Sequence, residues 1–165
     1  MAVVTFASGC FWGIEAAFQR VAGVIQTAVG YMGGSFENPT YKEVCTDRTG
    51  HAEVVQVTFD PARVSYEDLL EVFRQVHDPT QVERQGSDVG TRYRSAIFFH
   101  DADKTLAARE SRDPLHASGR LRRPIATEIT ARRHVLASRR VSPEVSADVL
   151  CSARFSLRTG TLATA

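Results

Sequence analysis

The 165-residue sequence predicts an α+β fold, a ferredoxin-like split βαβ sandwich with a mixed sheet and packed helices. Short β-branched and aromatic runs alternate with longer runs whose apolar residues recur at helical spacing. The order along the chain is strand, helix, strand, strand, helix, strand, which is the order of a split βαβ arrangement. A chain of this length suits one domain that can bury a core without metal or disulfide support.

Glycine-containing turns and apolar periodicity set the limits of the first elements. Ser8-Gly9 ends the first β-branched run, and the Gly33-Gly34 pair follows the second. We therefore expect, in order, a strand over Val3–Phe6, a helix over Gly13–Arg20, a strand over Val24–Gly30, a short helix over Tyr41–Cys45 and a strand over Val54–Phe59.

The second half begins with the clearest helix signal. Ser65 is a good N-cap with Asp68 three residues later, and an apolar stripe follows. Pro114 is expected to disturb a later helical run. The predictions are a helix over Tyr66–His77, a long polar loop over Asp78–Thr91, a strand over Ala96–His100, a helix over Ala102–Ser118 and a strand over Ile125–Thr130.

Composition excludes several classes of protein. Twenty basic and 19 acidic side chains give a net charge of +1, which argues against a nucleic-acid partner. No apolar run approaches the roughly 20 residues of a membrane-spanning helix, so we expect no membrane partner. Three widely spaced cysteines suit free thiols in a reducing cytosol, and five histidines without ligand spacing predict no metal. We expect a cytoplasmic monomer.

The composition changes near residue 130. Residues 1–130 carry 14 basic and 17 acidic side chains, a net charge of −3. Residues 131–165 carry six basic and two acidic side chains, a net charge of +4, and a single aromatic residue, Phe155. We therefore expect a folded domain over 1–130 and an atypical, disordered tail over 131–165.

Cys10 lies between two glycines, where a strand gives way to a helix. A thiol in that position faces unpaired backbone N–H groups and the positive end of the helix dipole, and both favour the thiolate. Phe11 and Trp12 would form an apolar wall beside the sulfur. The alternative is a buried structural cysteine flanked by core aromatic residues.

Three polar side chains could serve such a site. Glu53 precedes an alternating strand, and a carboxyl group at a strand mouth beside aromatic residues could have a raised pKa and donate a proton. Asp88 and Tyr93 lie in the long polar loop. The alternatives are a solvated glutamate at a strand end and a solvent-facing turn.

Together these segments resemble peptide methionine sulfoxide reductases of the A type. The resemblance runs nearly continuously through residues 3–130. Arg92 stands where the family usually has Gln. The matching segments are GCFWG at 9–13, GYMGG at 30–34, NPTY at 38–41, TGHAEVV at 49–55, FDP at 59–61, HDPTQ at 77–81, RQGSDVGTRYRSAIF at 84–98 and ASGR at 117–120.

The resemblance implies an enzyme that reduces methionine S-sulfoxide, free or in proteins, and leaves a sulfenic acid on its cysteine. Thioredoxin is the implied reductant, and no metal or organic cofactor is needed. The implied roles are nucleophile for Cys10, proton donor for Glu53, oxygen binding for Tyr41 and Tyr93, support of the polar network for Asp88, and methyl binding for Phe11 and Trp12.

Two other functions stay open at this level. One is a truncated product that binds oxidised methionine peptides or nothing and does not turn over. The other is a cysteine hydrolase that pairs Cys10 with His51. The recycling thiol is also open: Cys151 is a candidate that only flexibility could bring to Cys10, and Cys45 is expected to be buried in the core.

The family continues after the last strand with a segment like TFWxAExYHQxY, which is missing after Thr130. One choice of codons for Ala131–Cys151, read one base later, encodes PGGTFWRAEEYHQRYLRMYC. Each shifted codon has one free wobble position, so nine consecutive agreements through FWRAEEYHQ are improbable by chance. We hypothesise a one-base insertion at the Thr130–Ala131 junction. Sequencing the gene across that junction should reveal this second peptide in the shifted frame, and its absence there would refute the hypothesis.

Overall fold

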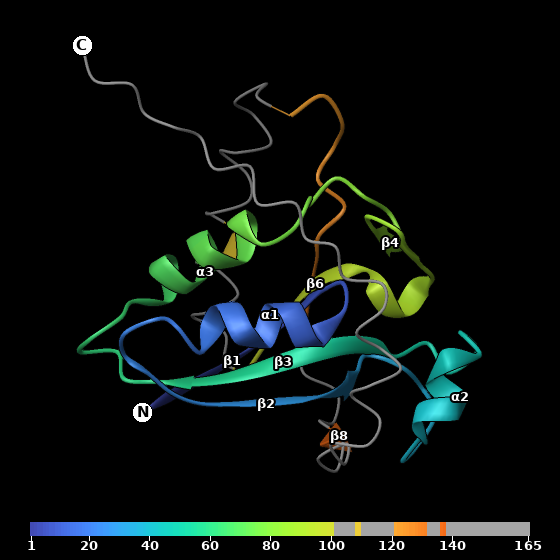
Figure 1. Ribbon diagram of the computed structural model, residues 1–165, viewed down its shortest axis with the longest axis horizontal. Helices are drawn as coiled ribbons and strands as arrows, with labels where there is room; N and C mark the ends of the chain where they lie inside the picture. Colours follow the sequence, from blue (N-terminus) through green and yellow to red (C-terminus); the bar gives the residue numbers. More distant parts are fainter. Residues whose placement is uncertain (101–107, 110–120, 132–135, 138–165) are drawn as a thin grey trace.

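The computed structural model describes residues 1–100, 108–109, 121–131 and 136–137. Within these ranges the chain forms a sheet, a small hairpin and three α-helices (Figure 1). The elements are β1 (Ala2–Ser8), α1 (Phe11–Phe18), β2 (Val24–Met32), α2 (Tyr41–Cys45), β3 (Ala52–Phe59), α3 (Tyr66–Gln75), β4 (Arg84–Gln85), β5 (Asp88–Val89), the 3₁₀ turn η1 (Thr91–Tyr93), β6 (Ser95–Phe99), β7 (Glu128–Ala131) and β8 (Leu136–Ala137).

The sheet has the strand order β7-β6-β1-β3-β2-β8. Within this order, the pairs β6–β1, β1–β3 and β3–β2 are antiparallel. Helix α1 joins β1 to β2 across β3, and α3 joins β3 to β6 across β1, which is the split βαβ topology. Strand β7 pairs with β6 in parallel and makes the sheet mixed. The predicted fold class is confirmed.

Both long helices pack on one face of the sheet, because alternate strand residues are apolar on that face. Val4 and Phe6 of β1 and Val55 and Val57 of β3 are fully buried there. Phe6 stacks between Phe18 of α1 and Phe73 of α3, with ring centroids 5.0 and 4.9 Å apart. A second buried cluster, which includes Met32, Val54 and Phe98, lies on the opposite face. The helices and the central strands are therefore fixed relative to one another.

Several boundaries differ from the sequence prediction. Helix α1 begins at Phe11, directly after Cys10, and not at Gly13. The predicted loop Asp78–Thr91 contains the hairpin β4–β5 and the start of η1. Strand pairing extends β1, β2 and β3 beyond their β-branched runs, because backbone hydrogen bonds do not depend on side-chain type.

The C-terminal part is described only in pieces. Of the predicted helix Ala102–Ser118, only 108–109 are described; they are helical, and Ala108 is buried in the core. The last predicted strand begins at Glu128 and not at Ile125. In the segment expected to be a disordered tail, Leu136–Ala137 pair with Gly30 and Tyr31 of β2. The remainder of 132–165 lies outside the described residues. No helix of the described chain is long and apolar enough to cross a membrane.

A short chain of hydrogen bonds links the segment after α3 to the start of β6 and to Thr127. The imidazole of His77 donates from Nδ1 to the Phe73 carbonyl at 2.6 Å and accepts at Nε2 from the Ser95 hydroxyl at 2.8 Å. The Ser95 and Thr127 hydroxyl oxygens are 2.7 Å apart. Burial lowers the pKa of His77 to about 4, against the opposing effects of the Phe73 carbonyl and Asp78. The ring is therefore neutral when the chain is folded.

This neutral histidine should make stability depend on pH. Between about pH 6.5 and pH 4 the unfolded chain binds a proton at His77 and the folded chain does not, so the free energy of unfolding falls as the pH falls. We expect a loss of up to about 3 kcal/mol from this group. Urea unfolding at both pH values should show a steeper dependence for the unaltered protein than for His77→Gln. Equal slopes in the two proteins would contradict this assignment.

Candidate active site

Cys10 is the N-cap residue of α1, at the point where β1 ends and the chain turns into the helix. Gly9 makes this turn possible with a φ of +96°. A Cβ atom on Gly9 would lie 2.8 Å from the Gln85 Cβ, so only glycine allows the turn to pack against β4. The Gln85 amide is held by both the N–H and the carbonyl of Asp78. The thiol is thus carried on a closely packed loop.

Glu53 reaches the same place from β3. Strand alternation puts it on the helix face of the sheet, in line with Val55 and Val57. Its side chain is 4% exposed, and its Oε2 accepts the backbone N–H of Phe11 at 3.2 Å. Burial raises the pKa of Glu53 to about 7, although the Phe11 N–H and Arg92 act against the rise. A buried carboxyl group of this kind can hold a proton at neutral pH.

The protonation state of Cys10 differs from the sequence expectation. Burial raises the pKa of the thiol to about 11, and this effect outweighs the hydrogen bond from the Trp12 N–H. Negative charge on Glu53 and Asp88 raises it further. The N–H at the helix start does favour the thiolate, as the sequence predicts, but desolvation and the two acidic neighbours outweigh it. Cys10 is a thiol at neutral pH.

Three tyrosines lie near enough to Glu53 for its charge to raise their pKa values, after other larger effects. Tyr31 of β2 is the cross-strand neighbour of Glu53, and its buried hydroxyl has no hydrogen-bond partner among the described residues. Tyr41 begins α2, and Tyr93 ends η1. Burial, followed by the charges of Glu53 and Tyr41, raises the pKa of Tyr31. The structure thus brings together the predicted Tyr41 and Tyr93 and adds Tyr31.

Sequence reasoning missed Tyr31, although a signal was present. Tyr31 lies in the GYMGG segment, two residues after Val29, and the period of a strand places both on the helix face. What the sequence did not show is that β2 pairs with β3 in the register that sets Tyr31 opposite Glu53.

Asp88 and Arg92 bring opposite charges to the site. Asp88 of β5 raises the pKa values of Cys10 and Glu53, after the larger effect of burial. The Arg92 guanidinium lies over the Tyr93 ring, 4.5 Å from its centroid. Asp88 thus acts on Cys10 and Glu53 through its charge.

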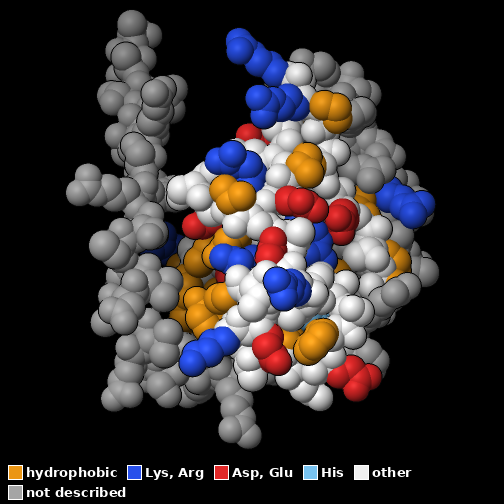
Figure 2. Space-filling view, turned by 90° about the vertical axis from the view of Figure 1, so that its right-hand side faces the viewer, with side chains coloured by type: hydrophobic (Ala, Val, Ile, Leu, Met, Phe, Trp, Pro, Cys, Tyr) orange, Lys and Arg blue, Asp and Glu red, His pale blue; other side chains and the backbone are white. Residues whose placement is uncertain are grey.

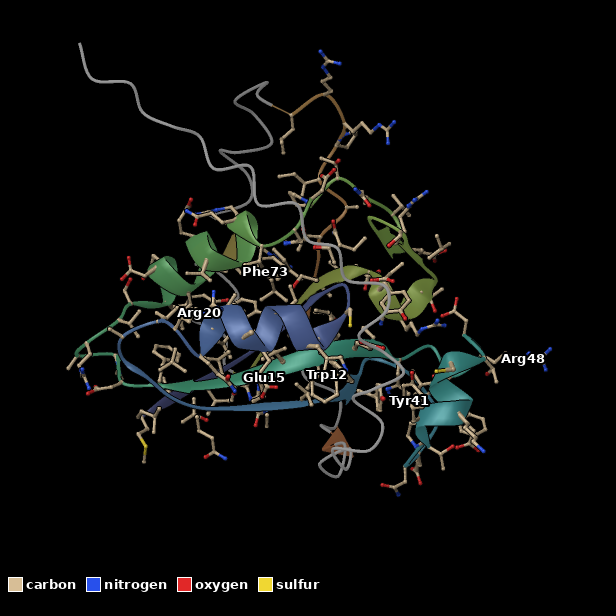
Figure 3. All side chains as sticks on the ribbon, viewed as in Figure 1. Trp12, Glu15, Arg20, Tyr41, Arg48 and Phe73 are labelled. Carbon is tan, nitrogen blue, oxygen red and sulfur yellow. The ribbon has the colours of Figure 1, made fainter. Side chains whose placement is uncertain are left out.

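The two aromatic residues after Cys10 have different environments. The Phe11 side chain is buried, with its ring centroid 5.9 Å from that of Tyr31, whereas Trp12 is 40% exposed. Their rings meet edge to face, with centroids 5.5 Å apart. Figure 3 shows Trp12 on α1 and Tyr41 on α2 toward the same end of the sheet. Together the rings provide an apolar surface next to the thiol.

The end of the molecule that carries α2 also has exposed apolar side chains. Phe36, Tyr41 and Val89 are each about half exposed or more. Figure 2 views this end and shows hydrophobic side chains among Lys, Arg, Asp and Glu side chains. The surface next to the site is therefore mixed in character.

His51 does not serve Cys10. Its Nδ1 accepts the Gly34 N–H at 3.2 Å, and its Nε2 donates to the Phe36 carbonyl at 2.8 Å. Both ring nitrogens are used to hold the loop between β2 and α2. The structure therefore argues against a Cys10–His51 hydrolase, since a general base needs a free ring nitrogen directed at the nucleophile.

The structure also bears on the other two cysteines and on metal binding. Cys45 is exposed at the end of α2, so the expectation of a buried core cysteine is wrong. The residue of α2 that is buried in the core is Val44. Cys151 lies outside the described residues. Within the described ranges, no three His, Cys, Asp or Glu side chains are grouped as metal ligands.

A family model for peptide methionine sulfoxide reductase matches residues 2–139. The chain belongs to this family. Among curated relatives, it is 61% identical over 125 residues to a peptide methionine sulfoxide reductase MsrA of Methanoculleus marisnigri, covering 76% of each chain. It is 58% identical over 127 residues to that of Geobacter metallireducens, covering 77% of this chain and 78% of the relative.

Solved structures of the family agree with the fold. The reduced form of Mxr1 from Saccharomyces cerevisiae matches with a TM-score of 0.78 at 30% identity, over 84% of this chain and 80% of the other. Methionine sulfoxide reductase A of Corynebacterium diphtheriae matches with a TM-score of 0.77 at 33% identity, over 98% of this chain and 80% of the other.

The charge of Glu53 should be measurable through the reactivity of Cys10. Above pH 7 the Glu53 carboxylate raises the pKa of the thiol, so Glu53→Gln should lower that pKa and speed alkylation of Cys10. At pH 8.5 we expect a rate increase of roughly threefold, which corresponds to about half a pKa unit.

Mass spectrometry of the peptide containing Cys10 during iodoacetamide treatment measures this rate. The exposed Cys45 is followed in the same sample as an internal control and should react equally fast in both proteins. Slower or unchanged alkylation of Cys10 in the variant would show that Glu53 does not act on the thiol.

Proposed function

We propose that this chain reduces methionine S-sulfoxide, free or in proteins, with Cys10 as nucleophile and Glu53 as proton donor. The observation that carries the proposal is the buried Glu53 carboxyl group, which accepts the N–H of the residue next to Cys10. This contact puts a group with a pKa of about 7 beside the thiol. Family membership supports the same chemistry.

The first step needs the proton that burial keeps on Glu53. A sulfoxide oxygen is a poor leaving group until it is protonated, so Glu53 gives its proton to that oxygen. The resulting positive charge makes the sulfoxide sulfur electrophilic and favours the thiolate of Cys10. The sulfur of Cys10 attacks, and its own proton passes to the Glu53 carboxylate.

The second step completes the exchange of oxygen. The bond between the substrate sulfur and the hydroxyl group breaks, and the hydroxyl group bonds to the Cys10 sulfur. The bond that the attack formed between the two sulfurs then breaks, and its electron pair goes to the substrate sulfur. The products are methionine and the sulfenic acid of Cys10. The substrate sulfur gains two electrons, and the sulfur of Cys10 loses them. Glu53 ends the step protonated, ready for another substrate.

The surrounding side chains would bind two groups of the substrate, the sulfoxide oxygen and the S-methyl group. The hydroxyls of Tyr41 and Tyr93, and of Tyr31 beside them, can donate hydrogen bonds to the sulfoxide oxygen. The aromatic pair Phe11 and Trp12 offers an apolar surface for the S-methyl group. The negative charge of Asp88 supports the protonated state of Glu53.

Return of the sulfenic acid to the thiol needs two electrons from other thiols. We infer that thioredoxin supplies them, as the family resemblance implies, and that no metal or organic cofactor takes part. A thiol-reducing cytosol suits this chemistry, and we infer a cytoplasmic monomer. The recycling cysteine is left open, with Cys151 as a candidate outside the described residues.

A single-turnover assay tests the chemistry without the recycling step. When the protein is mixed with the S-sulfoxide of N-acetylmethionine amide and no reductant, it should release about one molecule of the thioether product per Cys10. This product, N-acetylmethionine amide, is called the sulfide below. The rate should be highest below about pH 7 and fall above it, because Glu53 then loses its proton. Glu53→Gln should slow the release by about 100-fold, within the usual range for loss of a general acid.

Three controls make the result specific. Cys10→Ser should release no sulfide, and Glu67→Gln, on the exposed surface of α3, should behave as the unaltered protein. Repeating the assay with dithiothreitol and then with thioredoxin separates chemistry from recycling. Sulfide release by Cys10→Ser at the normal rate, or none by the unaltered protein, would refute the proposal.

A further inference from the structure

Asp47 has an unusual backbone for a residue with a side chain. Its φ is +62°, in the left-handed region where Asp is tolerated better than most residues. It lies two residues beyond α2, and its own N–H donates to the Val44 carbonyl at 3.0 Å. This turn directs the Asp47 carboxylate away from α2 and toward η1.

The Asp47 carboxylate binds the start of η1 through three hydrogen bonds. Oδ2 accepts the Thr91 N–H at 2.8 Å, and Oδ1 accepts the Thr91 hydroxyl at 2.9 Å. Oδ1 also accepts the Arg92 N–H at 3.2 Å. Desolvation alone would raise the pKa of Asp47, but these hydrogen bonds lower it, so the group is anionic.

Glycine at position 90 leaves room for this contact. A Cβ atom on Gly90 would lie 3.1 Å from both carboxylate oxygens of Asp47, closer than an ordinary van der Waals contact. Gly90 also has a φ of +140°. The approach of the carboxylate to η1 therefore depends on the backbone conformation at both ends of the contact.

Arg92 makes the return connection from η1 to α2. Its Nη1 donates to the carbonyl of Cys45, the last residue of α2, at 3.1 Å. The same nitrogen is 3.9 Å from Asp47 Oδ1. The Arg92 side chain is 19% exposed, so these contacts are partly shielded from water. Asp47 and Arg92 thus join two segments that are far apart in sequence.

Each end of this connection reaches a tyrosine of the proposed site. The Arg92 guanidinium covers the ring of Tyr93. At the other end, hydrogen bonding with Cys45, followed by burial, raises the pKa of Tyr41 to about 12. Tyr41 and Cys45 are the first and last residues of α2. The positions of both tyrosines therefore depend on how α2 and η1 are held together.

We propose that Asp47 and Arg92 are positioning residues that clamp η1 to the end of α2 and so fix the Tyr41 and Tyr93 hydroxyls around the sulfoxide oxygen. The proposal rests on the proposed reductase function. It assigns no contact with substrate to either residue. The clamp acts through geometry, since α2 has only five residues and little packing of its own beyond Val44.

The clamp has an electrostatic consequence that geometry alone would not produce. Burial raises the pKa of Glu53, and the Arg92 cation is one of the groups that limit the rise. Replacing Arg92 with an uncharged residue should move the pKa of Glu53 upward. The site would then keep its proton donor to a higher pH, even where the rate itself is lower.

Two variants of Arg92 separate these effects in the single-turnover assay. Arg92→Lys keeps the cation and loses the planar fork that reaches Cys45, so the maximal rate should fall about tenfold with the pH midpoint near 7 retained. Arg92→Gln loses both, so its rate should fall and its midpoint should rise by about half a pH unit. In both variants, the substrate concentration that gives half the maximal rate should change less than the maximal rate itself.

Asp47→Asn tests the other half of the clamp. The amide keeps the size of the side chain and directs an NH₂ group at one of the donors, so the maximal rate should again fall about tenfold. Amide hydrogen exchange at Thr91 and Arg92 should quicken by about tenfold or more. Asp68→Asn is the matched control, because it removes a similar carboxylate cap from the exposed start of α3.

The outcomes are distinguishable. Slower release with faster exchange in Asp47→Asn, and normal kinetics in Asp68→Asn, support the clamp. Unchanged release and exchange in folded Asp47→Asn, or one common pH midpoint for all three Arg92 forms, overturn it. No sulfide from the unaltered protein overturns the proposed function and this proposal together. The Arg92 variants provide the test if Asp47→Asn does not fold.

Discussion

The proposed site depends on the placement of one buried carboxyl group at the start of a helix. The hydrogen bond from the Phe11 N–H to Glu53 joins α1 to β3 immediately beside Cys10. It satisfies one of the N–H groups that a helix start leaves unpaired, and it fixes the proposed proton donor relative to the thiol. Glu53 continues the row of core residues Val55 and Val57, so packing of the helices on the sheet holds this contact in place.

The same burial determines where the protons reside. An isolated thiol at a helix start would tend to ionise, but here desolvation keeps Cys10 protonated, and the charge of Asp88, joined by that of Glu53 above about pH 7, adds to this effect. Desolvation also keeps a proton on Glu53 near neutral pH. Both groups therefore carry protons near neutral pH, and in the proposed mechanism the nucleophile develops only when the sulfoxide is protonated. A reactive thiolate is thus not exposed in the absence of substrate.

The remaining groups of the site come from short segments with few core contacts of their own. The 3₁₀ turn η1 and the five-residue α2 carry Tyr93 and Tyr41, while β2 carries Tyr31. The sheet fixes Tyr31 through strand pairing, whereas Tyr41 and Tyr93 lie outside its strands. Two hydrogen bonds join those segments: the Asp47 carboxylate accepts the Thr91 N–H, and the Arg92 guanidinium donates to the Cys45 carbonyl. Strand pairing and side-chain hydrogen bonds thus both position groups of the proposed site.

The sequence by itself determined the fold class, the short helix over Tyr41–Cys45, the family and the candidate residues around Cys10, because these depend on local periodicity, capping and motifs. Only the tertiary structure decided that Tyr31 faces Glu53, since this follows from the register of β2 on β3. The tertiary structure also decided that Cys45 is exposed, that His51 is occupied and that Cys10 stays protonated. Burial and hydrogen-bond partners arise when distant segments pack together, and the local pattern of residues does not contain them.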